Sequence, residues 1–259
     1  MFDLVPLNAK KYKTLSWSKF QDYRFASKFN IIPVVIAELA DVIATLPLAF
    51  VRYATGELEL VAIAALKNNE NWFITPAGKW VGGYVPAALR SYPFGLIRVA
   101  DAGQKILGID ESSGLIHANQ EHIAFFDDSG EHAAEVKNIV HFLQKITENK
   151  IATDAAVQSL DKANIIEPWP LGIQEGDDIT PVEGLYRINE GFLNNIDELQ
   201  FYELRKKNAL ALAYAQLFAQ KRMELLQRAR SMYINQRAHE HLLAQDSLDF
   251  EIGDDTLKF

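Results

Sequence analysis

The sequence predicts an α+β fold, with an antiparallel sheet in the N-terminal half and a mostly helical C-terminal half. Two pairs of short apolar segments, each pair separated by a turn, lie before residue 110, and long amphipathic segments follow residue 133. No low-complexity linker or internal repeat interrupts the chain. We therefore expect one domain over residues 1–259, with a boundary near residue 150 as the alternative.

Aromatic and basic side chains are interspersed along residues 1–30. So many exposed rings would promote aggregation, so this segment is expected to be an arm that packs on the domain. Pro33 follows the arm, and a proline is favoured in the first turn of a helix. The apolar spacing after it predicts a short helix over residues 34–44.

Three strands and a short helix are predicted next. Residues 48–51 and 58–61 form a hairpin around a turn at 54–56, and residues 72–74 form a third strand. Residues 95–99 and 105–109 form a second pair around Asp101-Ala102-Gly103. Between these pairs, Pro86 begins a short helix that Pro93 ends at about Ser91, because the residue before a proline is disfavoured in the α region.

The second half alternates helices with one strand. Amphipathic spacing predicts a helix over 133–147, and Thr153 or Asp154 caps a separate helix that runs to about Ala163. A returning strand at 185–188 precedes a helix over 196–206. The longest helix is predicted over 209–243, and an acidic tail over 246–259 is expected to fray.

Composition excludes several classes of function. The net charge of -8 and the pI near 5.3 disfavour nucleic-acid binding. The absence of cysteine excludes disulfides, thiolate metal sites and a cysteine nucleophile. Acidic Asp3 and the lysines at 10, 11 and 13 do not fit a signal peptide, and charges interrupt every apolar stretch long enough to span a membrane. We expect a soluble, cytoplasmic protein without a membrane span.

No standard catalytic or metal-binding pattern is present. His239 and His241 are two residues apart, a spacing that points two side chains to different sides of a helix. Gly82-Gly83 matches no phosphate-binding loop and is interpreted as a turn or a close approach of the backbone. Adjacent acids such as Asp177-Asp178 are typical of solvated turns. We predict no catalytic residues, no metal and no cofactor, and we favour a protein that is not an enzyme while an enzyme stays the alternative.

Large rings and a single cation gather between residues 72 and 94. Rings beside one guanidinium are typical of a site for a planar or anionic group. The alternative is that the rings build the core while the arginine fixes a loop. The candidate ligand-binding residues are Trp72, Trp80, Tyr84, Arg90 and Tyr92.

The long C-terminal helix carries five cations between Lys221 and Arg237. They form either a docking surface for an acidic partner or a solvated face with i,i+4 pairs such as Glu224 and Arg228. If the helix projects beyond the core, its methionine and leucine side chains form an interaction face through which the chain forms oligomers.

Motifs along nearly the whole chain resemble those of the bacterial SapC family. The central motif is Gly83-Tyr84-Val85-Pro86-Ala87, followed by Arg90 and Tyr92-Pro93-Phe94. Matching segments flank it on both sides: 4–7, Pro33 with Glu38, 47–51, 71–73, 167–168, 184–190 and 211–217. The similarly named peptide-transport permease is a different protein, because it requires transmembrane helices.

The resemblance implies a non-enzymatic binding or accessory protein. Family members are encoded near TonB-dependent receptors and near proteins similar to tryptophan halogenases or cupin-type oxygenases. This implies a role in peptide or natural-product modification, or in uptake, with a modifying enzyme or a peptide as partner. The family name implies a second role, in surface-layer assembly or export. An enzyme that acts with a partner or an unseen cofactor is a further alternative.

Overall fold

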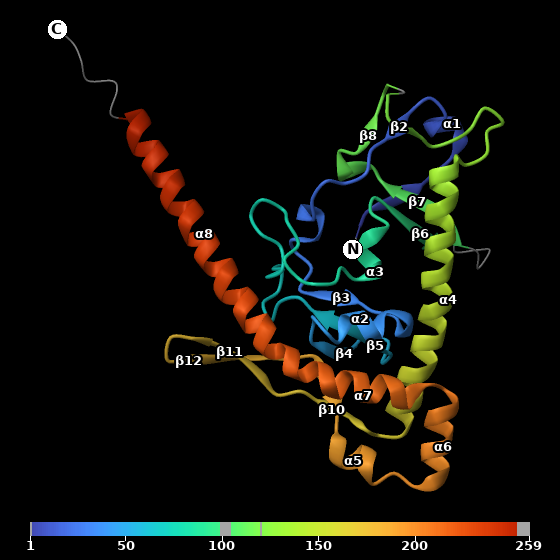
Figure 1. Cartoon of the computed structure of the whole chain (residues 1–259), viewed down its shortest axis with the longest axis vertical. Helices are drawn as coiled ribbons and strands as arrows, with labels where there is room; N and C mark the ends of the chain where they lie inside the picture. The colour runs from blue at the N-terminus through green and yellow to red at the C-terminus, as the bar shows by residue number, and fades with distance from the viewer. Residues whose placement is uncertain (1, 99–104, 120, 253–259) are drawn as a thin grey trace.

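A five-stranded antiparallel sheet forms the centre of the computed structural model, which describes residues 2–98, 105–119 and 121–252 (Figure 1). The strand order is β10-β13-β4-β5-β3. The strands span Ile166–Pro168, Leu185–Ile188, Leu48–Arg52, Leu58–Ile63 and Ile31–Pro33. The predicted β4–β5 hairpin is confirmed, and Gly56 adopts the positive φ of 87° that its turn needs. The predicted strand at 185–188 is β13, which pairs with β4.

Two smaller sheets lie beside this centre. One has the order β1-β7-β6 and the other β8-β2-β9. Their strands are β1 (Leu4–Pro6), β2 (Ser16–Trp17), β6 (Phe94–Arg98), β7 (Lys105–Asp110), β8 (Ile116–His117) and β9 (Ile123–Ala124). The predicted pairing of β6 with β7 is confirmed, but the expected turn at Asp101–Gly103 lies outside the described residues. These sheets enclose a second apolar cluster that includes Tyr12, Trp17 and Phe125.

Helix α4 (Ala134–Lys162) runs from beside β6 and β7 to the five-stranded sheet (Figure 1), and it contributes to both apolar clusters. Val136 and Leu143 pack in the smaller cluster, and Val157 and Leu160 pack in the larger one. The predicted division into two helices is wrong. The hydroxyl of Thr153 does not cap a helix of its own, because it donates to Asn149 O and accepts a hydrogen bond from Ile36 N at 2.9 Å.

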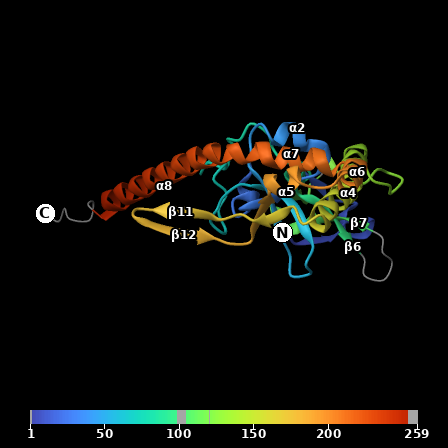
Figure 2. The same ribbon diagram turned by 90° about the horizontal axis from the view of Figure 1, so that it is seen from below.

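The C-terminal helices surround one end of the sheet. They are α5 (Glu190–Asn194), α6 (Glu198–Lys206), α7 (Ala209–Ala219) and α8 (Met223–Ile252). A 3₁₀ turn at Gln220–Arg222 interrupts the single helix predicted over 209–243, where Arg222 Nε donates to Ile43 O at 2.9 Å. The acidic segment expected to fray is helical as far as Ile252. The hairpin of β11 (Leu171–Glu175) and β12 (Asp178–Val182), absent from the predictions, lies beside α8 in both views (Figures 1 and 2).

The N-terminal arm packs on the domain, as predicted. It contains α1 (Ala9–Tyr12) and a 3₁₀ turn at Arg24–Ala26. The ring of Phe25 stacks on Tyr92 with centroids 3.9 Å apart, and Tyr23 lies 6.0 Å from Trp80. The arm therefore covers the aromatic segment between residues 72 and 94.

Two local predictions in the first half are wrong. Residues 34–44 form a 3₁₀ turn at Ile36–Glu38 followed by α2 (Leu39–Val42), and Pro33 ends β3 instead of opening a helix. Residues 72–74 form a turn, in which only Ile74 makes an isolated bridge to Trp80. The side chain of Asn71 fixes this turn: its Oδ1 accepts from Phe73 N, and its Nδ2 donates to Ala26 O. The short helix predicted after Pro86 is confirmed as α3 (Ala87–Arg90).

Candidate functional site

A buried carboxylate, that of Glu38, lies at the centre of the most connected polar cluster near the predicted site. Glu38 is 4% exposed. Its Oε1 accepts from Val35 N at 2.9 Å, at the start of its own 3₁₀ turn. Its Oε2 accepts from Tyr84 Oη at 2.9 Å and from Ala87 N at 2.7 Å, at the start of α3. Glu38 thus joins two family motifs that are distant in the sequence.

The loop that carries Tyr84 is held by close backbone contacts. Trp80 Nε1 donates to Tyr84 O at 3.0 Å. A Cβ on Gly82 would meet the Trp80 ring at 2.7 Å, and one on Gly83 would meet Thr45 Cγ2 at 2.7 Å. The Gly82-Gly83 pair is therefore a site of close approach, which is one of the two interpretations that the sequence allowed.

Arg90 ends α3 and is exposed at the surface. Its Nη2 donates to Tyr84 Oη at 2.9 Å, so this hydroxyl accepts from Arg90 while it donates to Glu38. The guanidinium lies 5.3 Å from the centroid of Phe142 on α4 and 5.4 Å from that of Tyr84. Two rings and one hydrogen bond thus fix the orientation of an exposed cation.

The electrostatic environment keeps Tyr84 protonated. Burial and the adjacent Glu38 carboxylate raise the pKa of Tyr84 to about 12, although Arg90 acts in the opposite direction. Asp41, which is exposed on α2, also raises this pKa. At neutral pH the phenol therefore remains a donor to Glu38 and an acceptor for Arg90.

Of the other three predicted residues, Trp72 and Tyr92 lie apart from this cluster, and Trp80 contacts it only through its hydrogen bond to Tyr84 O. Trp72 donates its Nε1 to Glu70 at 2.6 Å and lines a cleft of about 450 Å³ at the base of α8. Trp80 stacks on Phe73 and lines a separate cleft of about 430 Å³. Tyr92 is buried against Phe25 and donates to Asp110 at 3.3 Å. Of the five, the structure brings only Tyr84 and Arg90 into direct side-chain contact, and ligand binding by the others stays a prediction.

Polar contacts also connect the family motifs at 47–51, 167–168, 184–190 and 211–217 to one another. Gln216 is fully buried on α7, where its Oε1 accepts from Ile188 N and its Nε2 donates to Leu48 O. Glu167 accepts from Arg187 Nε and from Asn189 Nδ2. These motif residues therefore connect helices and strands of the larger core.

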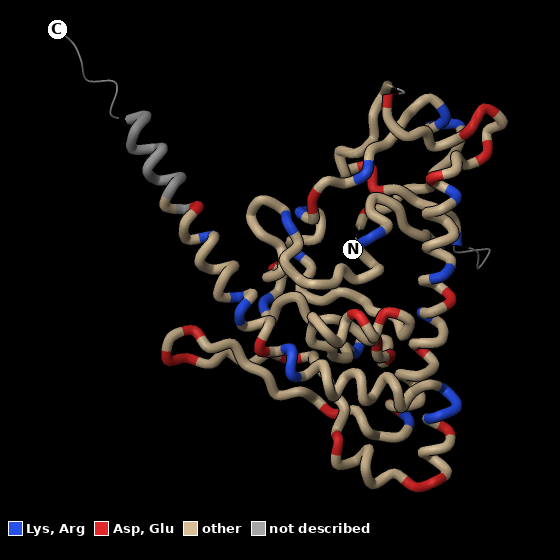
Figure 3. Tube along the Cα trace, in the orientation of Figure 1, with Lys and Arg blue, Asp and Glu red and all other residues tan. Residues whose placement is uncertain are grey.

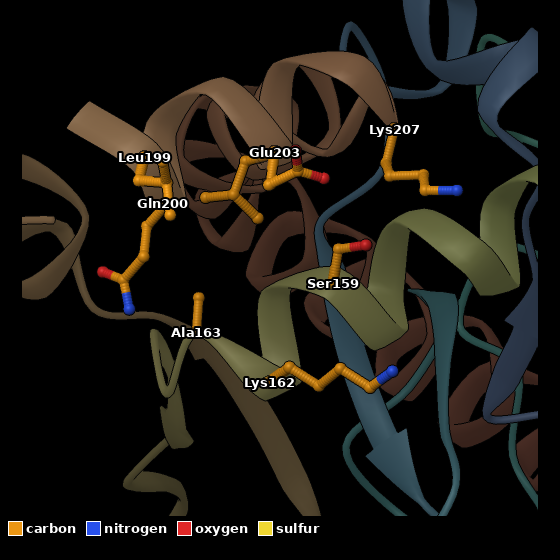
Figure 4. Close-up of a pocket in the computed structure, with 8 residues that line it drawn as sticks. Ser159, Lys162, Ala163, Leu199, Gln200, Glu203 and Lys207 are labelled. Atoms are coloured by element: carbon orange, nitrogen blue, oxygen red, sulfur yellow. The ribbon is translucent and has the colours of Figure 1, made fainter. Parts of the chain in front are cut away.

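Two further features contain polar side chains outside this cluster. The rings of His117 and His122 are tilted by 35° with centroids 4.1 Å apart, and Ser18 Oγ lies 2.9 Å from His117 Nε2. Among the described residues, no group of three or more His, Cys, Asp or Glu side chains is arranged to hold a metal ion. A pocket of about 350 Å³ between α4 and α6 contains none of the five predicted residues (Figure 4). It is lined by Ser159, Lys162, Ala163, Leu199, Gln200, Glu203, Leu204 and Lys207.

Comparison with known proteins identifies the family. The family model of SapC matches residues 7–226, so the chain belongs to the SapC family. No curated protein and no solved structure matches the chain. Within the part of the chain that the structure describes, no helix is long and apolar enough to cross a membrane.

Proposed function

We propose that this SapC-family protein is a non-enzymatic accessory protein of the cytoplasm that binds an acidic segment of a partner through Arg90. The orientation of the Arg90 guanidinium carries this proposal. It is exposed, it is fixed by Phe142 and Tyr84, and it has no carboxylate partner among the described residues. A guanidinium held in this way loses little side-chain entropy when an anion binds.

A carboxylate suits the guanidinium of Arg90. The planar fork of N–H donors matches the two oxygens of a carboxylate, and Tyr84 uses only Nη2. Sites for small molecules enclose most of their ligand, whereas Arg90 lies exposed on the surface. An Asp or Glu side chain, or the terminal carboxylate of a polypeptide, therefore fits the site better than a free small molecule.

The chemistry of the cluster favours binding over catalysis. Glu38 is buried and already accepts three hydrogen bonds, so it is not positioned to take a proton from a ligand. The Tyr84 hydroxyl donates its proton to Glu38, and its raised pKa makes it a weak acid toward a ligand. The part of the cluster available to a ligand is therefore the positive charge of Arg90.

The proposed partner is a peptide or a modifying enzyme, either halogenase-like or a cupin-type oxygenase, that presents an acidic segment. Asp41 lies close enough to affect Tyr84 and would repel such a segment. A single exposed contact of this kind supports weak and salt-sensitive binding. We therefore expect the partner to make further contacts around Arg90.

Fluorescence anisotropy with a labelled glutamate-rich peptide tests this proposal. We expect Arg90→Gln to weaken binding by about tenfold, because a charge-assisted pair is lost, and Asp41→Asn to strengthen it. The matched control is Arg205→Gln, which removes an exposed arginine on α6. A peptide with glutamine in place of glutamate should bind no variant. Equal affinity of Arg90→Gln and the wild type would reject Arg90 as the site.

A further inference from the structure

The second half of α8 leaves the body of the protein (Figures 1 and 2). Its first half packs on the larger core through Leu226, Ala229 and Tyr233, which are 1%, 2% and 8% exposed. From Ile234 to Leu242, every side chain that the structure describes is exposed. This part also lies beyond the family match, which ends at residue 226.

An apolar row runs along the projecting half. Ile234, Ala238 and Leu242 are spaced by four residues, which places them in one row on the helix surface. Ile234 is 49% exposed and Leu242 is 60% exposed. A helix that stands in water without tertiary contacts is marginally stable, so this row is expected to have a partner.

The two halves of the helix carry opposite charge. From Met223 to Arg237, α8 has Arg228, Arg230 and Arg237, with Glu224 the one acid. From Glu240 to Ile252 its sequence has Glu240, Asp246, Asp249 and Glu251, and no lysine or arginine. A parallel pair of such helices would place like charges together, whereas an antiparallel pair places the basic half against the acidic half.

We propose that two copies of this chain pair through α8 in an antiparallel arrangement, with the two-fold axis near Ala238. Position 234 of one copy then lies opposite position 242 of the other, so that Ile234 meets the partner copy's Leu242. Position 230, an arginine, lies opposite position 246, an aspartate. The small side chain of Ala238 allows the two helices to approach closely at the axis. The interface is isologous, because each copy contributes the same surface.

In the proposed dimer, a cleft at the base of α8 is a second place where the α8 of the other copy makes contact. It has a volume of about 450 Å³ and lies where the projecting half begins. Trp72, Tyr233 and Ile234 line it, and Lys67, Arg230 and Arg237 border it. Glu70 accepts from Trp72, and Glu175 pairs with Lys67 and Arg230, so Arg237 is the bordering cation without a carboxylate partner among the described residues. The antiparallel arrangement directs the acidic end of the second copy's α8 toward this cleft.

Cysteine crosslinking of the full chain tests the pairing, because the chain has no native cysteine. A residue on a two-fold axis meets its own copy, so Ala238→Cys should form a disulfide-linked dimer under mild oxidation. The matched control is Gln236→Cys, which lies roughly 160° around the helix from Ala238 at 100° per residue, and should remain monomeric. Mixing Ile234→Cys with Leu242→Cys should give the mixed dimer in preference to either self-linked dimer.

Light scattering of the wild type completes the test. The expected mass is twice 29.2 kDa, and Leu242→Asp should reduce it to that of the monomer without loss of helicity. High salt should weaken the dimer. A monomer at all concentrations, or self-linked Ile234→Cys dimers that indicate parallel pairing, would overturn the proposal. Binding of α8 to a different protein by a chain that stays monomeric would also overturn it.

Discussion

Glu38 joins three parts of the molecule through one side chain. Its carboxylate accepts from the backbone at the start of its own 3₁₀ turn, from the backbone at the start of α3 and from the Tyr84 hydroxyl. Each of these donors would lose its partner if the carboxylate were absent. Because Tyr84 in turn orients Arg90, the position of an exposed cation depends on a buried acid.

Replacing Glu38 with glutamine should destabilise the protein. The amide nitrogen of glutamine would face an N–H or O–H donor, so we expect a loss of about 1–3 kcal/mol in the free energy of unfolding. Urea denaturation measures this loss. Glu57→Gln, at an exposed position of the β4–β5 turn, is the matched control and should change stability by less than about 0.5 kcal/mol. Equal effects of the two substitutions would show that Glu38 does not organise this region.

Sequence reasoning found part of the site. It placed Tyr84 and Arg90 together because they are six residues apart in one dense segment. It identified Glu38 only as part of a family motif, since 46 residues separate Glu38 from Tyr84 and their contact depends on the tertiary fold. Phe142, the second ring beside Arg90, was not identified, because one phenylalanine in an amphipathic helix gives no signal of a surface contact.

At the scale of elements, the hairpin and the helices with clear periodicity were predicted well. The β4–β5 hairpin followed from apolar segments around a glycine turn. The continuity of α4 was missed because Thr153 has the residue type of a helix cap. Its hydroxyl instead accepts a hydrogen bond from Ile36 N, in the 3₁₀ turn at Ile36–Glu38. The β11–β12 hairpin was missed because its strands are mostly exposed and their apolar alternation is limited to Leu171 and Ile173, although Gly176 forms its turn at a φ of 65°.

The contact between α4 and the 3₁₀ turn at Ile36 gives a prediction at this scale. Thr153→Val keeps the shape and the β-branch of the side chain but leaves Ile36 N without its acceptor. We expect a loss of about 1–3 kcal/mol in the free energy of unfolding, measured by urea denaturation. The control is Ser159→Ala on the same helix, whose hydroxyl donates only within α4, to Ala155 O. If Thr153→Val is as stable as Ser159→Ala, the contact contributes little.

At the scale of the whole molecule, acids gather at the tip of the β11–β12 hairpin and cations at the adjacent part of α8 (Figure 3). Arg230 connects them, since it donates to Gln174 O at 3.0 Å and lies 3.6 Å from Glu175. This contact ties the hairpin to the base of α8. The contact therefore holds the base of α8 in place. This would keep the direction of the projecting half constant for pairing with a second copy.

Residue 150 lies inside α4, and the five-stranded sheet takes strands from both sides of it. A single domain therefore stays our prediction. Native-state hydrogen exchange in increasing urea checks it on the wild type. We expect β5 in the larger core and β7 in the smaller core to open with the same free energy and urea dependence. A separate opening of β7 at a lower free energy would instead indicate two units joined by α4.

Nuclear magnetic resonance of the Arg90 side chain tests whether Arg90 is a fixed cation that binds an acidic segment. In a protein labelled with ¹⁵N-arginine, the Nε–H signal of Arg90 would be followed while a glutamate-rich peptide is added. We expect a saturable, salt-sensitive shift of the Arg90 signal, with no such shift for exposed Arg205. A shift of equal size at both arginines, or none at Arg90 while the peptide binds, would contradict it.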